Sequence, residues 1–160
     1  MTILIPWLLL GGSLRIPALI HPTVLIGTSF AIGLLLILVG LYLLVITIRS
    51  FILIGRGTLA PWDPTKKLVV SGPYAYVRNP MISGVLAILL GESLLFLSWK
   101  IFAWFVLTFL INDLYFRLSE EPGLLARFGK EYEEYKRNVP RWIPRLKPWE
   151  PAHKGEAGTK

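Results

Sequence analysis

Two segments of this chain combine charged, aromatic and proline residues in a pattern that suits a binding site. The first, SGPYAYVRNPM, occupies residues 71–81 and directly precedes an apolar stretch. The second begins with the adjacent pair Glu120 and Glu121 and continues as FGKEY at 128–132 and VPRWIP at 139–144. Together they offer carboxylates, guanidinium groups and aromatic rings. Such a set suits a ligand that is part cation, part carboxylate and part aromatic base.

The expected helices bring these two segments together. Arg78 and Asn79 stand at the start of one apolar helix, where free backbone N–H groups and the positive dipole end bind polar or anionic groups. Glu120 and Glu121 lie just past the end of the next helix. If the two helices form an antiparallel hairpin, all four residues meet at its mouth, beside the tyrosines of both segments.

Each of these features, taken alone, has a simpler explanation. A tyrosine near a membrane surface is usually an interfacial anchor, and an arginine there is often only a marker of orientation. Two adjacent glutamates after a span are usually a solvated helix start. The sequence has no Rossmann glycine pattern, P-loop or Ser-His-Asp arrangement. The residues therefore predict a membrane protein with a polar site, and by themselves no particular reaction.

The composition predicts a single small membrane domain. The chain has 160 residues, 54% of them hydrophobic, and a mean hydropathy of +0.58, which is too apolar for a soluble domain of this size. It contains no cysteine, so a thiol nucleophile, a cysteine-ligated zinc and a disulfide are excluded. His21 and His153 lie far from both segments, and we expect no metal site.

The fold class expected is an all-α polytopic membrane protein with about three to four transmembrane helices and a C-terminal cytoplasmic or interfacial amphipathic helix. The predicted spans are 23–48, 81–97 and 99–118, because each is apolar over roughly the length that a bilayer requires. Residues 1–20 are interrupted by glycine, arginine and proline and form an uncertain first span. Residues 50–80 form a connector and 119–139 the amphipathic helix. One domain covers 1–148, and 149–160 form a disordered tail.

The basic residues predict the orientation. All lysines and arginines except Arg15 and Lys100 flank the hairpin predicted at 81–118. Lysine and arginine are in excess on the cytoplasmic side of a membrane. The connector and the C-terminus are therefore expected in the cytoplasm, in a multi-pass integral membrane protein. Because the charges border spans, they do not indicate a nucleic-acid partner.

Glu92 lies inside a predicted span. An ionisable residue at membrane depth is a functional candidate by default. Three roles are open for it: a hydrogen bond between helices, the rim of a polar cavity, or catalysis. The small residues Gly27, Gly33 and Gly40 recur on the first clear span and suit close helix packing in lipid.

In order and spacing, the two segments resemble the integral-membrane methyltransferases of the isoprenylcysteine carboxyl methyltransferase and phospholipid methyltransferase family. The resemblance covers roughly residues 53–145. It rests on Gly72 and Tyr74, on Arg78-Asn79-Pro80, on Glu120-Glu121, on Phe128-Gly129 with Tyr132 and Tyr135, and on Val139-Pro140. It implies an S-adenosyl-L-methionine-dependent methyltransferase, similar to the protein-S-isoprenylcysteine O-methyltransferases, and a lipophilic acceptor that enters from the bilayer.

The resemblance also implies roles for individual residues. Arg78, Glu121 and Arg117 are the candidates for the chemistry, with Arg117 as the nearest match to a basic residue that holds a substrate carboxylate. Asn79 stands where the prenylcysteine enzymes have histidine, so the acceptor is open between an isoprenylcysteine-like carboxylate and a lipid amine. An amine acceptor requires a general base, for which Glu92 and Glu121 are the candidates. The implied contacts to S-adenosylmethionine are Lys66, Lys67, Leu68, Val69, Gly72, Tyr74, Asn79, Pro80, Met81, Ile82, Glu120 and Tyr132.

Two other functions fit parts of the pattern. Sterol reductases, which are membrane enzymes that use NADPH, share a similar C-terminal arrangement of basic residues, prolines, an acidic pair and tyrosines, but they are longer and have more spans. A non-catalytic membrane scaffold or lipid-binding subunit is the alternative outside enzymes. Neither the acceptor nor the oligomeric state follows from the sequence.

Overall fold

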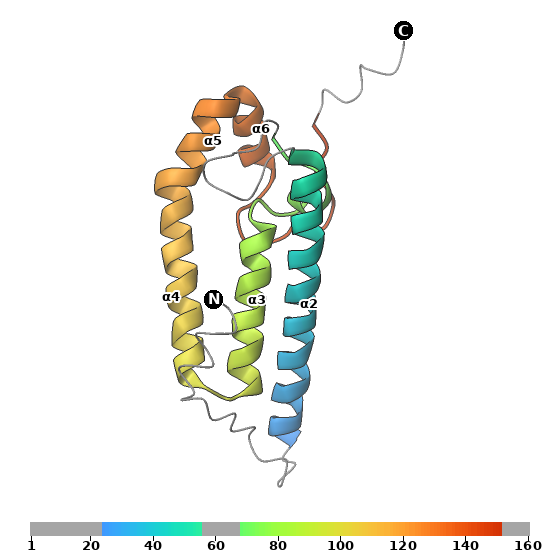
Figure 1. The fold of residues 1–160 in the computed structure, drawn as a ribbon, viewed down its shortest axis with the longest axis vertical. Coiled ribbons are helices and arrows are strands. Elements are labelled where there is room, and N and C mark those ends of the chain that lie inside the picture. Colours follow the sequence, from blue (N-terminus) through green and yellow to red (C-terminus); the bar gives the residue numbers. More distant parts are fainter. Residues whose placement is uncertain (1–23, 56–67, 152–160) are drawn as a thin grey trace. The chain divides into compact units, whose positions relative to one another are not determined.

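The computed structural model describes residues 24–55 and 68–151, and within these ranges every regular element is a helix (Figure 1). The chain divides into two compact units. Unit 1 comprises Met1–Leu44 and Ile82–Tyr115, and unit 2 comprises Val45–Met81 and Phe116–Lys160. The expected all-α class is confirmed for the described residues. The uncertain first span at 1–20 lies outside them.

The first described helix, α2, runs from Val24 to Gly55 and contributes to both units. The sequence predicted a membrane span over 23–48, and the stretch of α2 that is long and apolar enough to cross a membrane is Ile26–Ser50, which ends close to the predicted residue. The helix itself continues through Arg49 and Ser50 to Gly55. Ser50 is accommodated by a hydrogen bond from its Oγ to the Ile46 carbonyl oxygen, 2.8 Å away. Arginine has a high helix propensity, so a charge at the membrane surface does not by itself end a helix.

In unit 1, α2 packs against α3 (Pro80–Leu95) through glycines. A Cβ atom built on Gly40 would lie 2.6 Å from the Gly84 carbonyl oxygen, and one built on Gly91 would lie 2.6 Å from the Gly33 carbonyl oxygen. The two contacts are seven residues apart on each helix, and they occur in opposite order along the two helices. The two backbones therefore touch along an antiparallel seam where no side chain fits. Gly27 has nothing near its Cβ position and takes no part in this seam.

The helices α3 and α4 (Trp99–Tyr115) form the expected antiparallel hairpin. The turn between them contains Leu97 at φ 45, in the left-handed region, and closes with a hydrogen bond of 3.0 Å from the Ser98 N–H to the Ser93 carbonyl oxygen. The helix α3 begins at Pro80, as expected. It ends at Leu95, before the predicted residue 97, because the turn starts there.

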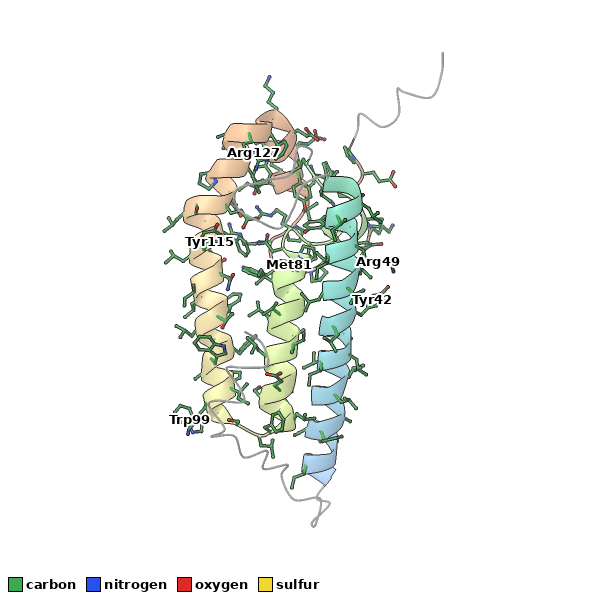
Figure 2. All side chains as sticks on the ribbon, viewed as in Figure 1. Tyr42, Arg49, Met81, Trp99, Tyr115 and Arg127 are labelled. Atoms are coloured by element: carbon green, nitrogen blue, oxygen red, sulfur yellow. The ribbon has the colours of Figure 1, made fainter. Side chains whose placement is uncertain are left out.

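By length and composition, two helical stretches of the described residues can span a membrane: Ile26–Ser50 and Trp99–Phe128. With 16 residues, α3 is apolar but shorter than the roughly 20 residues that a span requires. On both α2 and α4, large apolar side chains project outward, as Tyr42 and Trp99 do in Figure 2. Outward-facing apolar rows of this kind suit a lipid environment.

Unit 2 is built from short elements. A single turn of 3₁₀ helix, η1 (Gly72–Ala75), precedes α3. After α4 come a π-helix, η2 (Phe116–Glu120), and two helices, α5 (Glu121–Phe128) and α6 (Lys130–Asn138). The sequence predicted one amphipathic helix over 119–139. The structure has two, because Gly129 has φ 52 and breaks the run.

The core of unit 2 lies under α6. Tyr132, Tyr135 and Val139 are buried there, and around them pack Leu68, Val70, Leu124, Phe128 and Trp149. In one continuous helix over 119–139, Leu125 would share the apolar face of Tyr132 and Tyr135, but it is exposed, because the break at Gly129 turns α5 relative to α6. Trp149 was predicted to lie in the tail. It packs on Tyr135 with ring centroids 5.6 Å apart, so the packed chain extends beyond residue 148.

Candidate functional site

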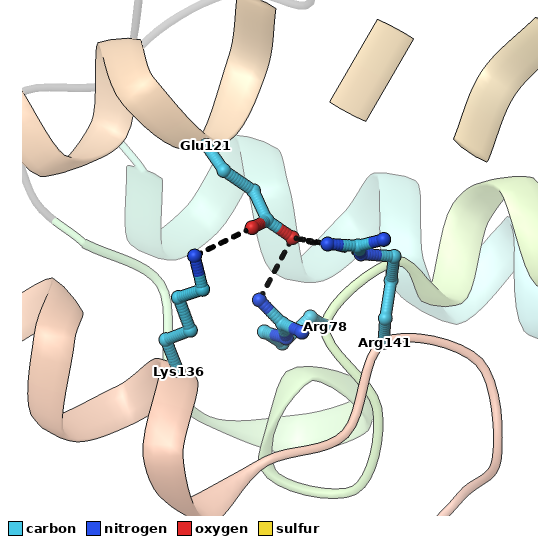
Figure 3. Close-up of polar contacts among 4 residues, drawn as sticks. All are labelled: Arg78, Glu121, Lys136 and Arg141. Atoms are coloured by element: carbon cyan, nitrogen blue, oxygen red, sulfur yellow. Dashed lines mark hydrogen bonds and ion pairs between the residues drawn. The ribbon is translucent and has the colours of Figure 1, made fainter. Parts of the chain in front are cut away.

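The two segments singled out in the sequence meet in unit 2 around the carboxylate of Glu121, which is only 7% exposed (Figure 3). Arg78 Nη1 lies 2.9 Å from Glu121 Oε1, and Arg141 Nη2 lies 2.6 Å from the same oxygen. Lys136 Nζ lies 2.9 Å from Oε2. We refer to Arg78, Glu121, Lys136 and Arg141 as the Glu121 ion cluster. The predicted meeting of Arg78 with Glu121 is therefore observed.

The π-helix η2 sets the direction of Glu121. In an α-helix two residues five apart are separated by roughly 140° around the axis. A π-helix has more residues per turn, so residues five apart lie closer to the same face than they do in an α-helix. Phe116 and Glu121, at the two ends of this turn, are both buried. Phe116 packs against Trp142, with ring centroids 5.7 Å apart.

Tyr74 and the other acidic residue, Glu120, belong to the same unit. Burial raises the pKa of Tyr74 from 10.0 to about 12, and the negative charge of Glu120 acts on it in the same direction. The main chain of Tyr74 is held, because the Tyr135 hydroxyl donates a hydrogen bond of 2.8 Å to the Tyr74 carbonyl oxygen.

Tyr132 and Tyr135 line the same part of unit 2. Burial raises the pKa of Tyr132, and the nearby Glu121 charge adds to this effect. Burial also raises the pKa of Tyr135. Both hydroxyls thus remain protonated at neutral pH, and they serve as neutral hydrogen-bonding groups on an aromatic surface.

The other predicted cofactor contacts are distributed along the same segment. Val69 and Pro80 are buried, Leu68 packs on the unit 2 core, and Asn79 directly precedes α3. Gly72 has φ 63, a conformation that favours glycine, and starts η1. Met81 ends the first stretch of unit 2, and Ile82 belongs to unit 1. Lys66 and Lys67 lie outside the described residues, so their predicted role stays a prediction.

Two of the sequence-based candidates stand apart from the cluster. Arg117 lies on η2 with its side chain exposed. Glu92 lies on α3 in unit 1, and its side chain is buried, with Oε2 lacking a hydrogen-bond partner in the described part of the chain. The structure therefore does not place either of them within the Glu121 ion cluster.

Sequence reasoning missed two members of the cluster. Lys136 was not among the candidate site residues, and Arg141 was identified only as part of the VPRWIP segment. Arg141 could have been recognised from its position, because it is a basic residue directly after Val139-Pro140, where α6 has ended and the chain changes direction. The signal for Lys136 was weaker, since its side chain is half-exposed and reaches Glu121 by its length.

Comparison with known proteins decides the family. The family model described as phospholipid methyltransferase matches residues 28–131. The chain belongs to the phospholipid methyltransferase family. The match includes η1, the α3–α4 hairpin and the acidic pair, so the family assignment rests on the elements that build the site.

A curated relative points in the same direction. Over 80 residues the chain is 36% identical to protein-S-isoprenylcysteine O-methyltransferase of Schizosaccharomyces pombe (strain 972 / ATCC 24843). The alignment covers 48% of this chain and 33% of the relative, so the chain matches about a third of that protein's length. No solved structure matches the chain significantly. The family membership and the apolar helices together support a membrane methyltransferase.

Proposed function

We propose that this protein is an S-adenosylmethionine-dependent methyltransferase of the membrane, with its cofactor site in unit 2. The observation that supports this most directly is the Glu121 ion cluster, which joins the segment that contains Tyr74 and Arg78 to the acidic pair that contains Glu120. A carboxylate and an aromatic ring at one place suit a cation, and a sulfonium is attracted to an aromatic face by up to about 2 kcal/mol when desolvated.

The residues present fit the cofactor. Glu120 and Tyr74 suit the sulfonium and ammonium charges, and the exposed edge of the segment from Leu68 to Met81 suits the adenosine. S-adenosylmethionine supplies a methyl group that is already activated by the sulfonium. The protein then has to hold both partners close and in line, which is worth several orders of magnitude in rate. It also has to keep water out, for which the tyrosines and Trp142 provide apolar surface.

The acceptor proposed is lipophilic and enters from the bilayer. Two classes remain: a carboxylate like that of isoprenylcysteine, and a lipid amine. A carboxylate acceptor needs no general base, and Arg117, whose side chain is exposed, is the candidate to bind it. An amine acceptor needs a base, for which Glu92 and Glu121 remain the sequence-based candidates. The membrane orientation that we propose puts unit 2 in the cytoplasm, as the basic residues indicate.

Calorimetric titration of the detergent-solubilised protein with S-adenosylhomocysteine tests this function, with NADPH titrated in parallel. Saturable binding of S-adenosylhomocysteine alone is expected. We expect Glu120→Ala to abolish this binding while the apparent melting temperature stays near that of the wild type. Binding of NADPH alone would instead indicate a membrane reductase, and binding of neither would indicate a non-catalytic scaffold.

Transfer of a labelled methyl group separates the two acceptor classes. An S-farnesylcysteine derivative and phosphatidylethanolamine are offered separately in mixed micelles. Labelling of the first alone would assign a carboxylate acceptor, and labelling of the second alone an amine acceptor. If Arg117 holds a carboxylate, Arg117→Gln raises the KM for the first acceptor and leaves cofactor binding unchanged.

A further inference from the structure

The two glutamates of the acidic pair have different surroundings. Both oxygens of Glu121 accept charged donors: Oε1 from Arg78 and Arg141, and Oε2 from Lys136 (Figure 3). Arg141 Nε adds a further hydrogen bond to Oε1 at 2.8 Å. A carboxylate has about four acceptor positions, so this set nearly fills it. Glu120 is in a different setting: burial raises its pKa, and the negative charge of Glu121 acts in the same direction.

The three cations of the cluster come from separate stretches of chain. Arg78 precedes α3, Lys136 lies on α6, and Arg141 follows α6. Glu121 itself begins α5. One carboxylate therefore joins four stretches of unit 2. A buried charge with three partners has few alternative arrangements, since moving any one partner leaves a charge unpaired and desolvated.

A series of backbone hydrogen bonds runs beside the cluster and attaches the C-terminal segment (residues 139–149) to the chain before α3. The donors and acceptors are Arg78 N–H to Pro140 O at 2.9 Å, Arg145 N–H to Tyr76 O at 3.0 Å, and Trp149 N–H to Ala75 O at 3.0 Å. The C-terminal segment thus runs antiparallel to residues 75–78. These are the residues that directly follow Tyr74.

We infer that Glu121 and Arg141 are positioning residues, which lock the C-terminal segment onto residues 74–78 and so hold Tyr74 and Glu120 in place for the cofactor. This inference rests on the proposed function. Glu121 acts through its neighbours, because its own oxygens are occupied and unavailable to a proton or a ligand. Most of the C-terminal segment lies beyond residue 131, where the family match ends, so the match itself does not reveal this part of the site.

The small net contribution of such an ion cluster to stability supports a role in fixing the position of the chain. Desolvating a buried ion cluster costs about as much as its attractions return, so such clusters add little net stability. What a saturated cluster supplies is one defined arrangement of the chain. This arrangement fixes both residues that we propose for the sulfonium site. Glu120 is held because it is bonded to Glu121, and Tyr74 is held because the C-terminal segment binds the residues that follow it.

Four variants of the full chain, purified in detergent, test this inference: Glu121→Gln, Arg141→Gln, the double variant, and the control Arg137→Gln. Arg137 makes an ion pair of 2.6 Å with Glu133, but both side chains are exposed. By calorimetry, Glu121→Gln and Arg141→Gln are expected to raise the Kd for S-adenosylhomocysteine about tenfold or more, a loss typical of one charge-assisted contact. The control is expected to stay within about twofold, as for exposed pairs.

Two features distinguish positioning from a general loss of fold. The double variant is expected to bind about as weakly as the worse single variant, because both changes release the same segment. Arg141→Lys, which keeps a charge on Glu121, is expected to recover part of the affinity. In turnover assays the KM for S-adenosylmethionine rises, while kcat at saturating cofactor changes less.

Amide hydrogen exchange supplies a readout that needs no cofactor. Peptides covering 139–149 and 74–78 are expected to exchange faster in Glu121→Gln and Arg141→Gln than in the wild type. Their exchange rates are expected to be unchanged in Arg137→Gln. If Glu121→Gln does not fold, Lys136→Gln replaces it, since the Lys136 side chain is half-exposed and Glu121 keeps its two arginine partners when the lysine is lost.

Folded Glu121→Gln and Arg141→Gln proteins that bind S-adenosylhomocysteine as the wild type does would overturn the inference. So would unchanged hydrogen exchange in the C-terminal segment of both variants. A wild-type protein that binds no S-adenosylhomocysteine would overturn the proposed function and, with it, the positioning role. Hydrogen exchange in that case still tests the attachment itself, so the two failures are distinguishable.

Discussion

In unit 1 the helices α2 and α3 touch through pairs of glycines, whereas in unit 2 four stretches of chain meet at one buried carboxylate. The first contact depends on the absence of side chains, with Gly40 against Gly84 and Gly33 against Gly91. The second depends on long charged side chains that reach Glu121. The contacts inside unit 1 and the contacts inside unit 2 are thus of different kinds.

The difference follows from the surroundings that each unit suits. Lipid tails are as apolar as leucine, so two helices in a bilayer gain little from burying apolar side chains and associate by close van der Waals contact. Where water is available outside, a buried charge cluster can be completed by solvated lysine and arginine stems. Unit 1 is therefore suited to be a frame, and unit 2 is suited to carry chemistry that needs charge.

The largest effect is expected from the apolar contact of unit 2. Phe116→Ala removes a buried ring that packs on Trp142, at a cost of about 3–5 kcal/mol of stability. The apparent melting temperature in detergent should fall strongly. Phe30→Ala, at an exposed position of α2, should change it little. An equal effect of the two variants would mean that the unit 2 core does not govern unfolding.

A smaller effect is expected from the glycine seam of unit 1. A methyl group on Gly40 would lie 2.6 Å from a backbone oxygen that cannot move without shifting α3. Gly40→Ala should therefore cost about 1–3 kcal/mol, as overpacking usually does. Gly27→Ala is the matched control on the same helix, since its Cβ meets nothing within 4 Å and alanine favours the helix. The same melting measurement compares them, and a stabilising Gly40→Ala would contradict the seam.

The smallest effect is expected from the tyrosines of unit 2 at alkaline pH. The pKa of Tyr74 is raised by burial, and then by Glu120, from 10.0 in the unfolded chain to about 12. Between these values the unfolded state binds fewer protons than the folded state, so stability is full below pH 10 and falls as pH rises toward 12. Melting temperatures from pH 8 to 12 measure this. Tyr74→Phe should flatten the fall, and an unchanged pH profile in that variant would contradict the raised pKa of Tyr74.

Much of the candidate site was predictable from local sequence patterns. Pro80 after Asn79 marked a helix start, and the two apolar stretches after it marked a hairpin. An antiparallel hairpin necessarily brings the residues before its first helix near those after its second, so Arg78 and Glu121 were expected to meet. The family resemblance was equally local, because it depends on short motifs in a fixed order.

The helix ends and breaks were less predictable. The apolar stretch of α2 ends at Ser50, close to the predicted span end at 48, but the helix continues to Gly55, because a charged residue with high helix propensity does not stop a helix. Gly129 divides the predicted amphipathic helix into α5 and α6, since it adopts a positive φ that nothing in the apolar spacing reveals. The expectation for Leu125 failed for the same reason.

The sequence by itself determined the apolar helices, the glycines available for close contact and the two motifs that identify the family, because each depends on neighbours along the chain. Only the tertiary structure decided which glutamate of the pair is enclosed by cations, and that Lys136, Arg141 and the C-terminal segment belong to the site. The ion pairs of the cluster join residues that are 15 to 43 positions apart. No periodicity records such a pairing, because it depends on how the chain turns at η2, at Gly129 and at Pro140.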